Sequence, residues 1–146
     1  TFAFYKRLED AAKRCVYKGK NGVIVETKDG GYQGIFWNLS DSEQVDIQVK
    51  LPAEAKEYTL LKETVDEVTT NPLKAWHDLG EPRNPSKAEI EIIRRFAYPF
   101  CESDILTKSR GKVGFDVTVR PHGVVYAELK KRCFEGDTGF TYGRRE

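Results

Sequence analysis

Two segments of the sequence alternate apolar and polar side chains at successive positions. In residues 45–51 the alternate positions hold Val, Ile, Val and Leu, and residues 113–120 repeat the pattern with Val, Phe, Val and Val. Because successive side chains of a strand point to opposite faces, each segment predicts a β-strand that buries one face. Such a face needs a second layer to pack against, so the pattern favours packed sheets.

Five further runs are rich in β-forming residues: 22–28, 32–38, 57–65, 103–107 and 124–129. Turn signals separate several of them, notably Asp29-Gly30-Gly31 and Pro121-His122-Gly123. The spacing is that of hairpins, and no strand–helix–strand alternation suggests a parallel sheet. The sequence therefore predicts a mainly β fold, an antiparallel β-sandwich of about seven strands.

One helical pattern precedes the strands. Apolar side chains recur at helical spacing from the start of the chain, which predicts a helix over residues 2–16. Its stripe consists of Phe4, Leu8, Ala11, Ala12 and Cys15.

A loop and a second helix interrupt the strands between residues 66 and 100. Asn71-Pro72, Gly80-Glu81-Pro82 and Asn84-Pro85 break every periodic pattern in residues 66–86, which predicts an irregular loop. A short helix follows, because Ser86 and Glu89 have the spacing of a capping box. Its apolar stripe is Ile90, Ile93, Phe96 and Ala97, and Pro99 ends it.

Composition excludes several kinds of partner. The 24 basic and 23 acidic side chains give a net charge of +1, so nothing favours binding to nucleic acid. No apolar run is long enough to span a membrane, and no membrane partner is expected. The chain has no Met and starts directly in a helical pattern, so we expect it to be an excised fragment.

The three cysteines, Cys15, Cys101 and Cys133, are widely spaced and odd in number. They argue against a disulfide framework, and we expect reduced thiols, two of them in the core. Reduced thiols favour a cytoplasmic location.

Few residues suggest chemistry. The two histidines lie in different irregular segments, and no Cys-x-x-Cys pair or glycine-rich phosphate loop appears, so no metal or cofactor is expected. His122 lies at a turn and is interpreted as structural. Adjacent His77 and Asp78 leave open a small hydrolytic enzyme. No two carboxylates stand out as the pair that glycoside hydrolysis requires.

The two tryptophans are the side chains best suited to contact sugars or other chains. Trp37 alternates with Gln33 and Ile35 in a predicted strand, so we expect it in the core. Trp76 lies in the loop, where it either packs that loop onto the sheets or lines a contact surface. An independent carbohydrate-binding module is therefore an alternative, marked by a row of exposed aromatic side chains.

Residues 71–86 carry a more specific signal. They read Asn-Pro-Leu-Lys-Ala-Trp-His-Asp-Leu-Gly-Glu-Pro-Arg-Asn-Pro-Ser. This segment resembles the Asn-Pro…Trp…Gly-x-Pro…Pro-Ser loop of glycoside hydrolase family 39, in particular of bacterial β-xylosidases. Ile-Phe-Trp-Asn at 35–38 and Pro-His-Gly-Val-Val-Tyr-Ala-Glu-Leu at 121–129 also fit. Residues 1–5 resemble the last helix of the family's catalytic barrel, and α-L-iduronidases are a less close match.

The resemblance implies a (β/α)₈ barrel followed by a β-sandwich, and a retaining mechanism with two glutamates of the barrel. No position here matches either glutamate, so no catalytic residue is assigned. The resemblance implies a non-catalytic C-terminal part of a xylan 1,4-β-xylosidase. We expect a terminal barrel helix (1–18), a sandwich (19–130) with a loop-helix insertion (66–100), and a polar tail (131–146).

Two kinds of contact are expected of such a part. It would brace the catalytic barrel of the same parent chain, with Trp76, His77 and Arg83 as the candidate contact surface. It would also make homo-oligomer contacts, because the stripe of the first helix, including Phe4 and Leu8, was built to face absent strands. We therefore expect that helix to be buried against a neighbouring copy.

Overall fold

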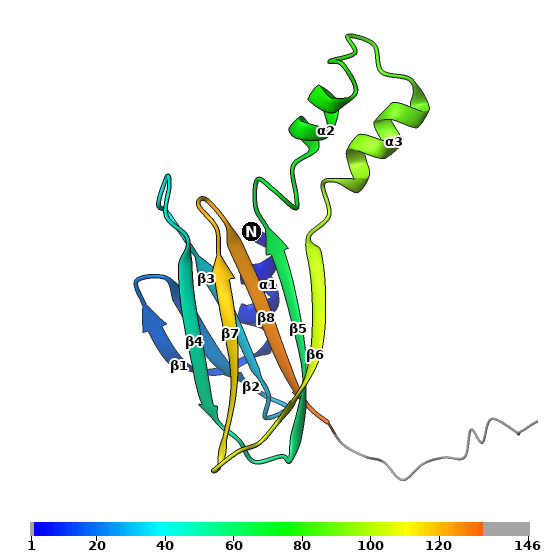
Figure 1. The fold of residues 1–146 in the computed structure, drawn as a ribbon. Coiled ribbons are helices and arrows are strands. Elements are labelled where there is room, and N and C mark those ends of the chain that lie inside the picture. The colour runs from blue at the N-terminus through cyan, green and yellow to red at the C-terminus, as the bar shows by residue number, and fades with distance from the viewer. Residues whose placement is uncertain (1, 133–146) are drawn as a thin grey trace, which may run out of the picture.

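The computed structural model describes residues 2–132, which form eight strands and three helices (Figure 1). The elements are α1 (Phe2–Ala11), β1 (Ala12–Gly19), β2 (Gly22–Thr27), β3 (Tyr32–Trp37), β4 (Val45–Pro52), β5 (Glu57–Val65), α2 (Pro72–Asp78), α3 (Lys87–Arg95), β6 (Phe100–Thr107), β7 (Lys112–Val119) and β8 (Val124–Lys131). All strand pairs are antiparallel, which confirms the predicted mainly β, antiparallel class.

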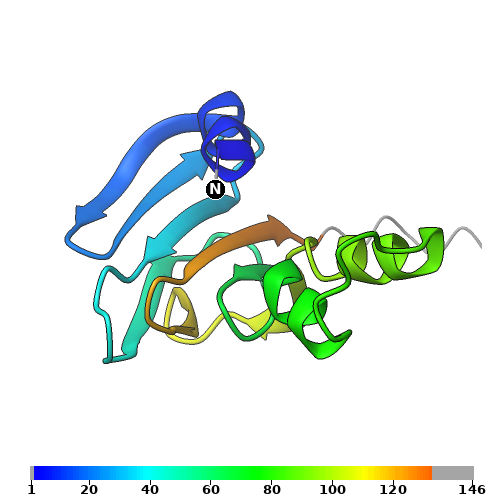
Figure 2. The ribbon, with the colours of Figure 1, turned by 90° about the horizontal axis from the view of Figure 1, so that it is seen from above.

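The strands form a large sheet and a small one. The six-stranded sheet has the order β1-β2-β3-β8-β5-β6, and β4 pairs with β7 in a two-stranded sheet. Seen from above, the small sheet lies against one face of the large sheet and leaves β1 and β2 extending beyond it (Figure 2). The small sheet is made of the two alternating segments, so its apolar faces lie against the large sheet.

The main core lies between the two sheets. Val49 and Leu51 of β4 are buried while Gln48 and Lys50, which alternate with them, are exposed, as the pattern predicts. These side chains pack with inward-facing residues of the large sheet, among them Phe36, Leu60 and Leu129. Full burial of each such side chain stabilises the fold by about 1.5–3 kcal/mol.

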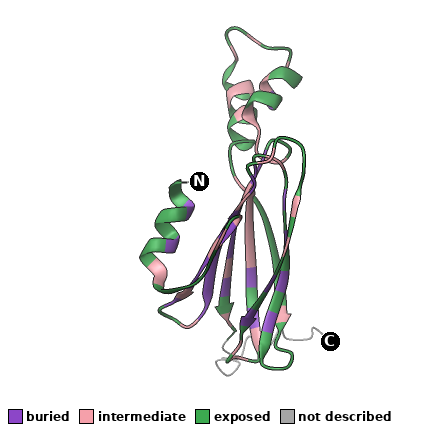
Figure 3. Cartoon of the chain, turned by 90° about the vertical axis from the view of Figure 1, so that its left-hand side faces the viewer, coloured by how far each residue is buried: buried purple, intermediate pink, exposed green. Residues whose placement is uncertain are grey.

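Helix α1 covers the opposite face of the large sheet (Figure 3). Phe4 and Leu8 are buried there with Ile35 and Tyr126, and the rings of Phe4 and Tyr126 stack at 5.3 Å. The guanidinium of Arg7 lies 5.1 Å and 4.6 Å from the centres of those rings. The expectation that Phe4 and Leu8 face absent strands is therefore wrong, because their own sheet covers them.

The first helix is shorter than predicted. It ends at Ala11, and the residues that follow pair with β2 as strand β1, so residues 12–16 of the predicted helix belong to the sheet. Val16 and Tyr17 favour strands, and backbone pairing with β2 outweighs the weak helical periodicity. Two register shifts along β1 show that this pairing is irregular.

The insertion contains two helices rather than one. The prediction of an irregular loop over residues 66–86 is wrong for α2, which extends from the sheets beside α3 (Figure 1). Asn71 caps α2 by accepting a hydrogen bond from the Lys74 N–H at 2.9 Å, and Pro72 occupies its first turn. Proline is favoured there because it has no N–H to satisfy, so Asn71-Pro72 starts a helix. Helix α3 has the predicted capping box of Ser86 and Glu89.

The cysteines depart from expectation. Cys15 in β1 and Cys101 in β6 are both exposed thiols, since each lies on an outer strand of the large sheet. The prediction of two core cysteines is therefore wrong. Cys133 and the predicted tail from residue 133 lie outside the described residues, and Lys131 belongs to β8. Within residues 2–132, no helix is long and apolar enough to cross a membrane.

Candidate functional site

The predicted contact residues lie on the insertion. Trp76 and His77 belong to α2, and Arg83 lies in the connection to α3. Trp76 is half-buried and its indole N–H donates to the carbonyl of Pro82 at 3.2 Å, so it fixes the connection to its own helix. His77 and Arg83 are exposed, and the His77 ring lies 5.1 Å from the Trp76 ring. The structure thus brings Trp76 and His77 together.

Exposed apolar side chains also lie on the insertion. No residue of α3 is buried, and large apolar groups remain in contact with solvent. Among them are Val68, Leu73, Ile92, Phe96 and Tyr98. An apolar surface on a protruding element is typical of a protein contact.

His77 and Asp78 do not form a catalytic pair. The His77 Nδ1 lies 2.6 Å from Glu81, while Asp78 pairs with Lys74 at 2.5 Å, both along the exposed surface of α2. The four best-formed cavities of the described residues are lined by other residues. No group of three metal-binding side chains occurs within residues 2–132. His122 lies at the predicted turn, with Nε2 3.1 Å from Asp41.

Sequence reasoning missed the largest of these cavities, a groove of about 780 Å³ between β1 and β4. Its floor includes Ile24 of β2 and Phe36 of β3. One wall is formed by residues 14–17 of β1, and the other by residues 47–52 of β4. We call this cavity the β1–β4 groove.

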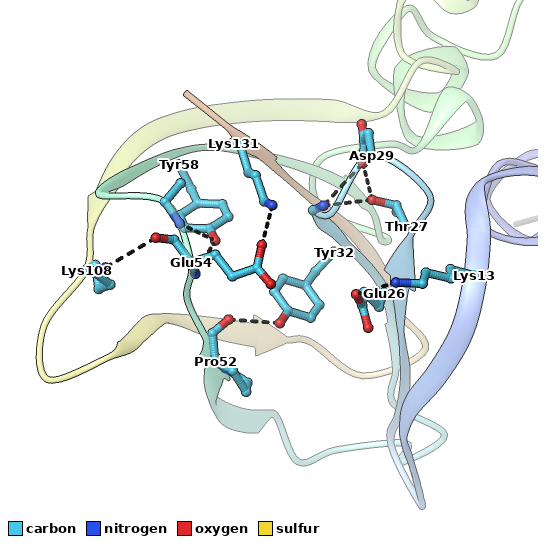
Figure 4. Close-up of polar contacts among 12 residues, drawn as sticks. Lys13, Glu26, Thr27, Asp29, Tyr32, Pro52, Glu54, Tyr58, Lys108 and Lys131 are labelled. Atoms are coloured by element: carbon cyan, nitrogen blue, oxygen red, sulfur yellow. Dashed lines mark hydrogen bonds and ion pairs between the residues drawn. The ribbon is translucent and has the colours of Figure 1, made fainter. Parts of the chain in front are cut away.

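Three polar side chains at the β1–β4 groove, Tyr32, Glu26 and Glu54, already have partners (Figure 4). The Tyr32 hydroxyl donates to the carbonyl of Pro52 at 2.8 Å. Glu26 accepts from Arg14 at 2.5 Å and from Lys13 at 3.3 Å, and Glu54 pairs with Lys131 at 2.6 Å.

These partners set the charge of the two carboxyl groups that line the groove. The hydrogen bond from Arg14, with that from Lys13, lowers the pKa of Glu26 from its ordinary value. The hydrogen bond from Lys131 lowers the pKa of Glu54 in the same way. Both groups are therefore held as carboxylates at neutral pH, which is the wrong state for a general acid.

The exposed aromatic side chains of the described residues are spread over several elements. Tyr17 on β1 and Phe100 on β6 lie on opposite edge strands of the large sheet, and Phe96 and Tyr98 lie on the insertion. Trp37 is half-buried and packs against the core under α1, as predicted.

Comparison with known proteins identifies the family. The sequence model of glycosyl hydrolases family 39 matches residues 35–114, more than half of the chain, and the chain belongs to that family. It is 21% identical over 138 residues to a β-xylosidase of Geobacillus stearothermophilus, covering 89% of this chain and 26% of that protein. The chain therefore spans about a quarter of that relative's length.

Solved structures show the same fold. A family 39 enzyme of Xanthomonas axonopodis pv. citri matches with a TM-score of 0.71 and 16% identity, over 88% of this chain and 29% of that one. A monomeric β-xylosidase of Caulobacter crescentus matches with a TM-score of 0.69 and 16% identity, over 88% and 30% of the two chains.

Proposed function

We propose that this chain is a non-catalytic β-sandwich part of a larger retaining β-xylosidase that acts on xylan or xylo-oligosaccharides, C-terminal to its catalytic barrel. Family membership and the β-xylosidase relative support a glycosidase parent, and the chain spans only about a quarter of that relative. The observation that carries the non-catalytic role is that no position of this sequence matches either catalytic glutamate of the family. The two carboxyl groups that line the β1–β4 groove, Glu26 and Glu54, agree with it, because both have lowered pKa values where a general acid needs a raised one.

An assay of the isolated chain tests this proposal. We expect the pure 146-residue chain to release no nitrophenol from a nitrophenyl β-xyloside. A double variant, Glu26→Gln with Glu54→Gln, is the matched control. Release that separates from the chain on a further column reveals a contaminating enzyme. Release that stays with the pure chain would refute the non-catalytic role, and its loss in the double variant would assign it to Glu26 and Glu54.

The role of the part in its parent is to brace the barrel. We propose that the insertion makes this contact through Trp76, His77 and Arg83 with the exposed apolar groups beside them. Trp76→Ala in the parent enzyme should lower its melting temperature or alter its assembly at unchanged kcat. If the variant loses turnover while its melting temperature and assembly stay normal, Trp76 takes part in catalysis instead.

Two further features of the proposal concern assembly and location. We propose homo-oligomer contacts through the same insertion, although the Caulobacter relative is described as monomeric. Light scattering of the parent with and without Leu73→Ser and Tyr98→Ser would detect them, since both side chains are exposed. The exposed thiols of Cys15 and Cys101 support a cytoplasmic location, which fractionation of the source cells tests.

The independent carbohydrate-binding module remains the alternative. The exposed aromatic groups on opposite sheet edges favour the bracing role over it. Retention of the isolated chain on insoluble xylan, reversed by soluble xylo-oligosaccharide, would favour the module.

A further inference from the structure

The β1–β4 groove lies between two open sheet edges. Among the strands of residues 2–132, β1 pairs only with β2 and β4 pairs only with β7, so within this part of the chain each has one edge without a neighbouring strand. Consecutive residues of both strands line the groove, as expected when backbone edges form its walls. Open edges expose a row of N–H and C=O groups that can pair with another strand.

The register shows which backbone groups of β4 face the groove. The Ala53 N–H donates to the carbonyl of Gly111. In an antiparallel ladder every second residue pair is hydrogen-bonded, so Leu51 with Val113 is the next such pair between β4 and β7. The residues between them direct their N–H and C=O groups away from β7. The carbonyl of Pro52 is one of these, and it accepts from Tyr32 across the groove.

Most of this edge has no partner. The outward-facing backbone groups belong to Asp46, Gln48, Lys50 and Pro52. Within residues 2–132, the Pro52 carbonyl is the one of these groups that has a hydrogen bond, which it accepts from Tyr32. Proline at this end costs no ladder bond, because its nitrogen lies on the open side. Three N–H donors at alternate residues thus remain available, about 7 Å apart along the strand.

The opposite wall and the floor suit apolar side chains. Tyr17 pairs with Ile24, so both side chains lie on the groove side of the large sheet. Tyr17 is 51% exposed, although Ile24 beside it is buried. The acidic groups at the groove already have cationic partners. What the groove offers a ligand is therefore an apolar surface, a strand edge and the side chains of Gln48 and Lys50 on that edge.

The other edge of the small sheet borders smaller cavities, of about 490 and 360 Å³. Charged side chains line them, including Lys62, Glu102, Asp116 and Arg120. Charged groups are a usual means of protecting an edge strand against pairing. The β4 edge also has charged groups beside it, such as Lys50, but it differs from the β7 edge in the larger volume of its groove.

We propose that the β1–β4 groove receives an extended segment of the parent polypeptide from outside these 146 residues, which pairs with β4 as a third strand of the small sheet. The segment carries apolar side chains at alternate positions, which cover Ile24, Phe36 and Tyr17. This inference rests on the proposed function in one respect, because it requires that the chain is part of a longer parent protein. The chain spans 26% of its β-xylosidase relative, so ample polypeptide is available. Strand addition to an exposed edge is a recurrent mode of peptide binding.

Peptides from the parent test this inference. Overlapping 16-residue synthetic peptides that tile the rest of the parent sequence are added to the isotope-labelled 146-residue chain, and amide exchange is followed by NMR. We expect one tile, or two that overlap, to slow exchange at Asp46, Gln48 and Lys50 at least tenfold. Gln48→Pro should weaken that peptide about tenfold, because it removes an outward N–H and keeps the β7 ladder.

Asp116→Pro is the matched control, since Asp116 lies opposite Gln48 and its N–H faces the other edge. It should change the affinity less than twofold. If Gln48→Pro fails to fold, Tyr17→Ala probes the opposite wall through a half-exposed side chain and should also weaken binding.

Several results would overturn the inference: no binding tile, protection of β7 rather than β4, or protection of β4 by xylohexaose. Protection of β4 that rises with protein concentration alone would assign the groove to a second copy. None of these results alters the outcome of the xyloside assay, so the two proposals fail separately.

Discussion

Asp66 connects the insertion to the sheets, and its removal should destabilise the fold measurably. Its side chain is 1% exposed and accepts hydrogen bonds from the Val68 and Thr69 N–H groups at 2.9 and 2.7 Å and from the Thr69 hydroxyl at 2.9 Å. Arg120, at the end of β7, pairs with it at 3.0 Å. Asp66 thus holds the first turn of the insertion against the small sheet.

The size of the effect follows from these contacts. Each of the three hydrogen bonds from residues 68 and 69 contributes about 1 kcal/mol. The pair with Arg120 contributes roughly 0.5 kcal/mol, because the Arg120 side chain is 46% exposed. Asp66→Ala should therefore lower the free energy of unfolding by about 3.5 kcal/mol, and Asp66→Asn by about 1 kcal/mol because the amide keeps an acceptor.

The effect should also depend on pH. Burial would raise the pKa of Asp66, but hydrogen bonds from Thr69, Arg120 and Val68 outweigh it and lower the pKa from its ordinary value. A carboxyl group with a lowered native pKa stabilises the fold fully above its unfolded pKa of about 3.9. This stabilisation is lost as the pH falls through the lower native value. The difference between wild type and Asp66→Asn should therefore be constant near pH 7 and shrink below about pH 4.

Urea unfolding followed by circular dichroism measures these differences. Asp46→Ala is the matched control, because Asp46 also accepts from a threonine hydroxyl, Thr118 at 2.7 Å, but is exposed. It should change the stability by less than about 0.5 kcal/mol. Equal destabilisation by Asp66→Ala and Asp46→Ala would refute the reasoning from burial, and a pH-independent Asp66→Asn effect would refute the reasoning from charge.

Three further predictions concern α1, the cap of α3 and the cysteines. Phe4→Ala should lower the free energy of unfolding in urea by about 3–5 kcal/mol, because Phe4 is 2% exposed. Phe2 is 83% exposed, so Phe2→Ala should change it by less than about 0.5 kcal/mol, and similar losses for both variants would mean that α1 does not pack on the sheet. Ser86→Ala should cost about 1 kcal/mol by removing the cap of α3, and Ser86→Asp should restore it. Cys15 and Cys101 should both react with a thiol reagent without denaturant; peptide mapping that finds either unmodified would contradict their exposure.

The strands could be predicted from the sequence better than the helices, because strict alternation is stronger evidence than a weak helical periodicity. Strict alternation in residues 45–51 has one interpretation, and the strand observed there is Val45–Pro52. The run of apolar residues from Phe4 to Cys15 fitted a helix over its whole length, yet β1 begins at Ala12. What decides this boundary is pairing with β2, a contact that periodicity within one segment does not contain.

The insertion shows the same limit at a single dipeptide. Asn71-Pro72 is both a turn signal and a helix start, and the sequence alone does not separate these readings. The structure does so, because the Lys74 N–H bonds to Asn71 and the backbone then continues as α2. Ser86 with Glu89 was less ambiguous, since two reciprocal bonds at a fixed spacing have few alternatives to a helix start.

The β1–β4 groove could not be predicted, since it depends on which strands lack neighbours. Val45, Ile47, Val49 and Leu51 showed that β4 has a buried face, but that pattern is the same for a central strand and an edge strand. Pro52 was the one local sign, because proline in a sheet is confined to strand ends and open edges. Only the order of strands in both sheets reveals that β1 and β4 each have an open edge. Features of a site that arise from the absence of a partner strand therefore become visible only in the assembled fold.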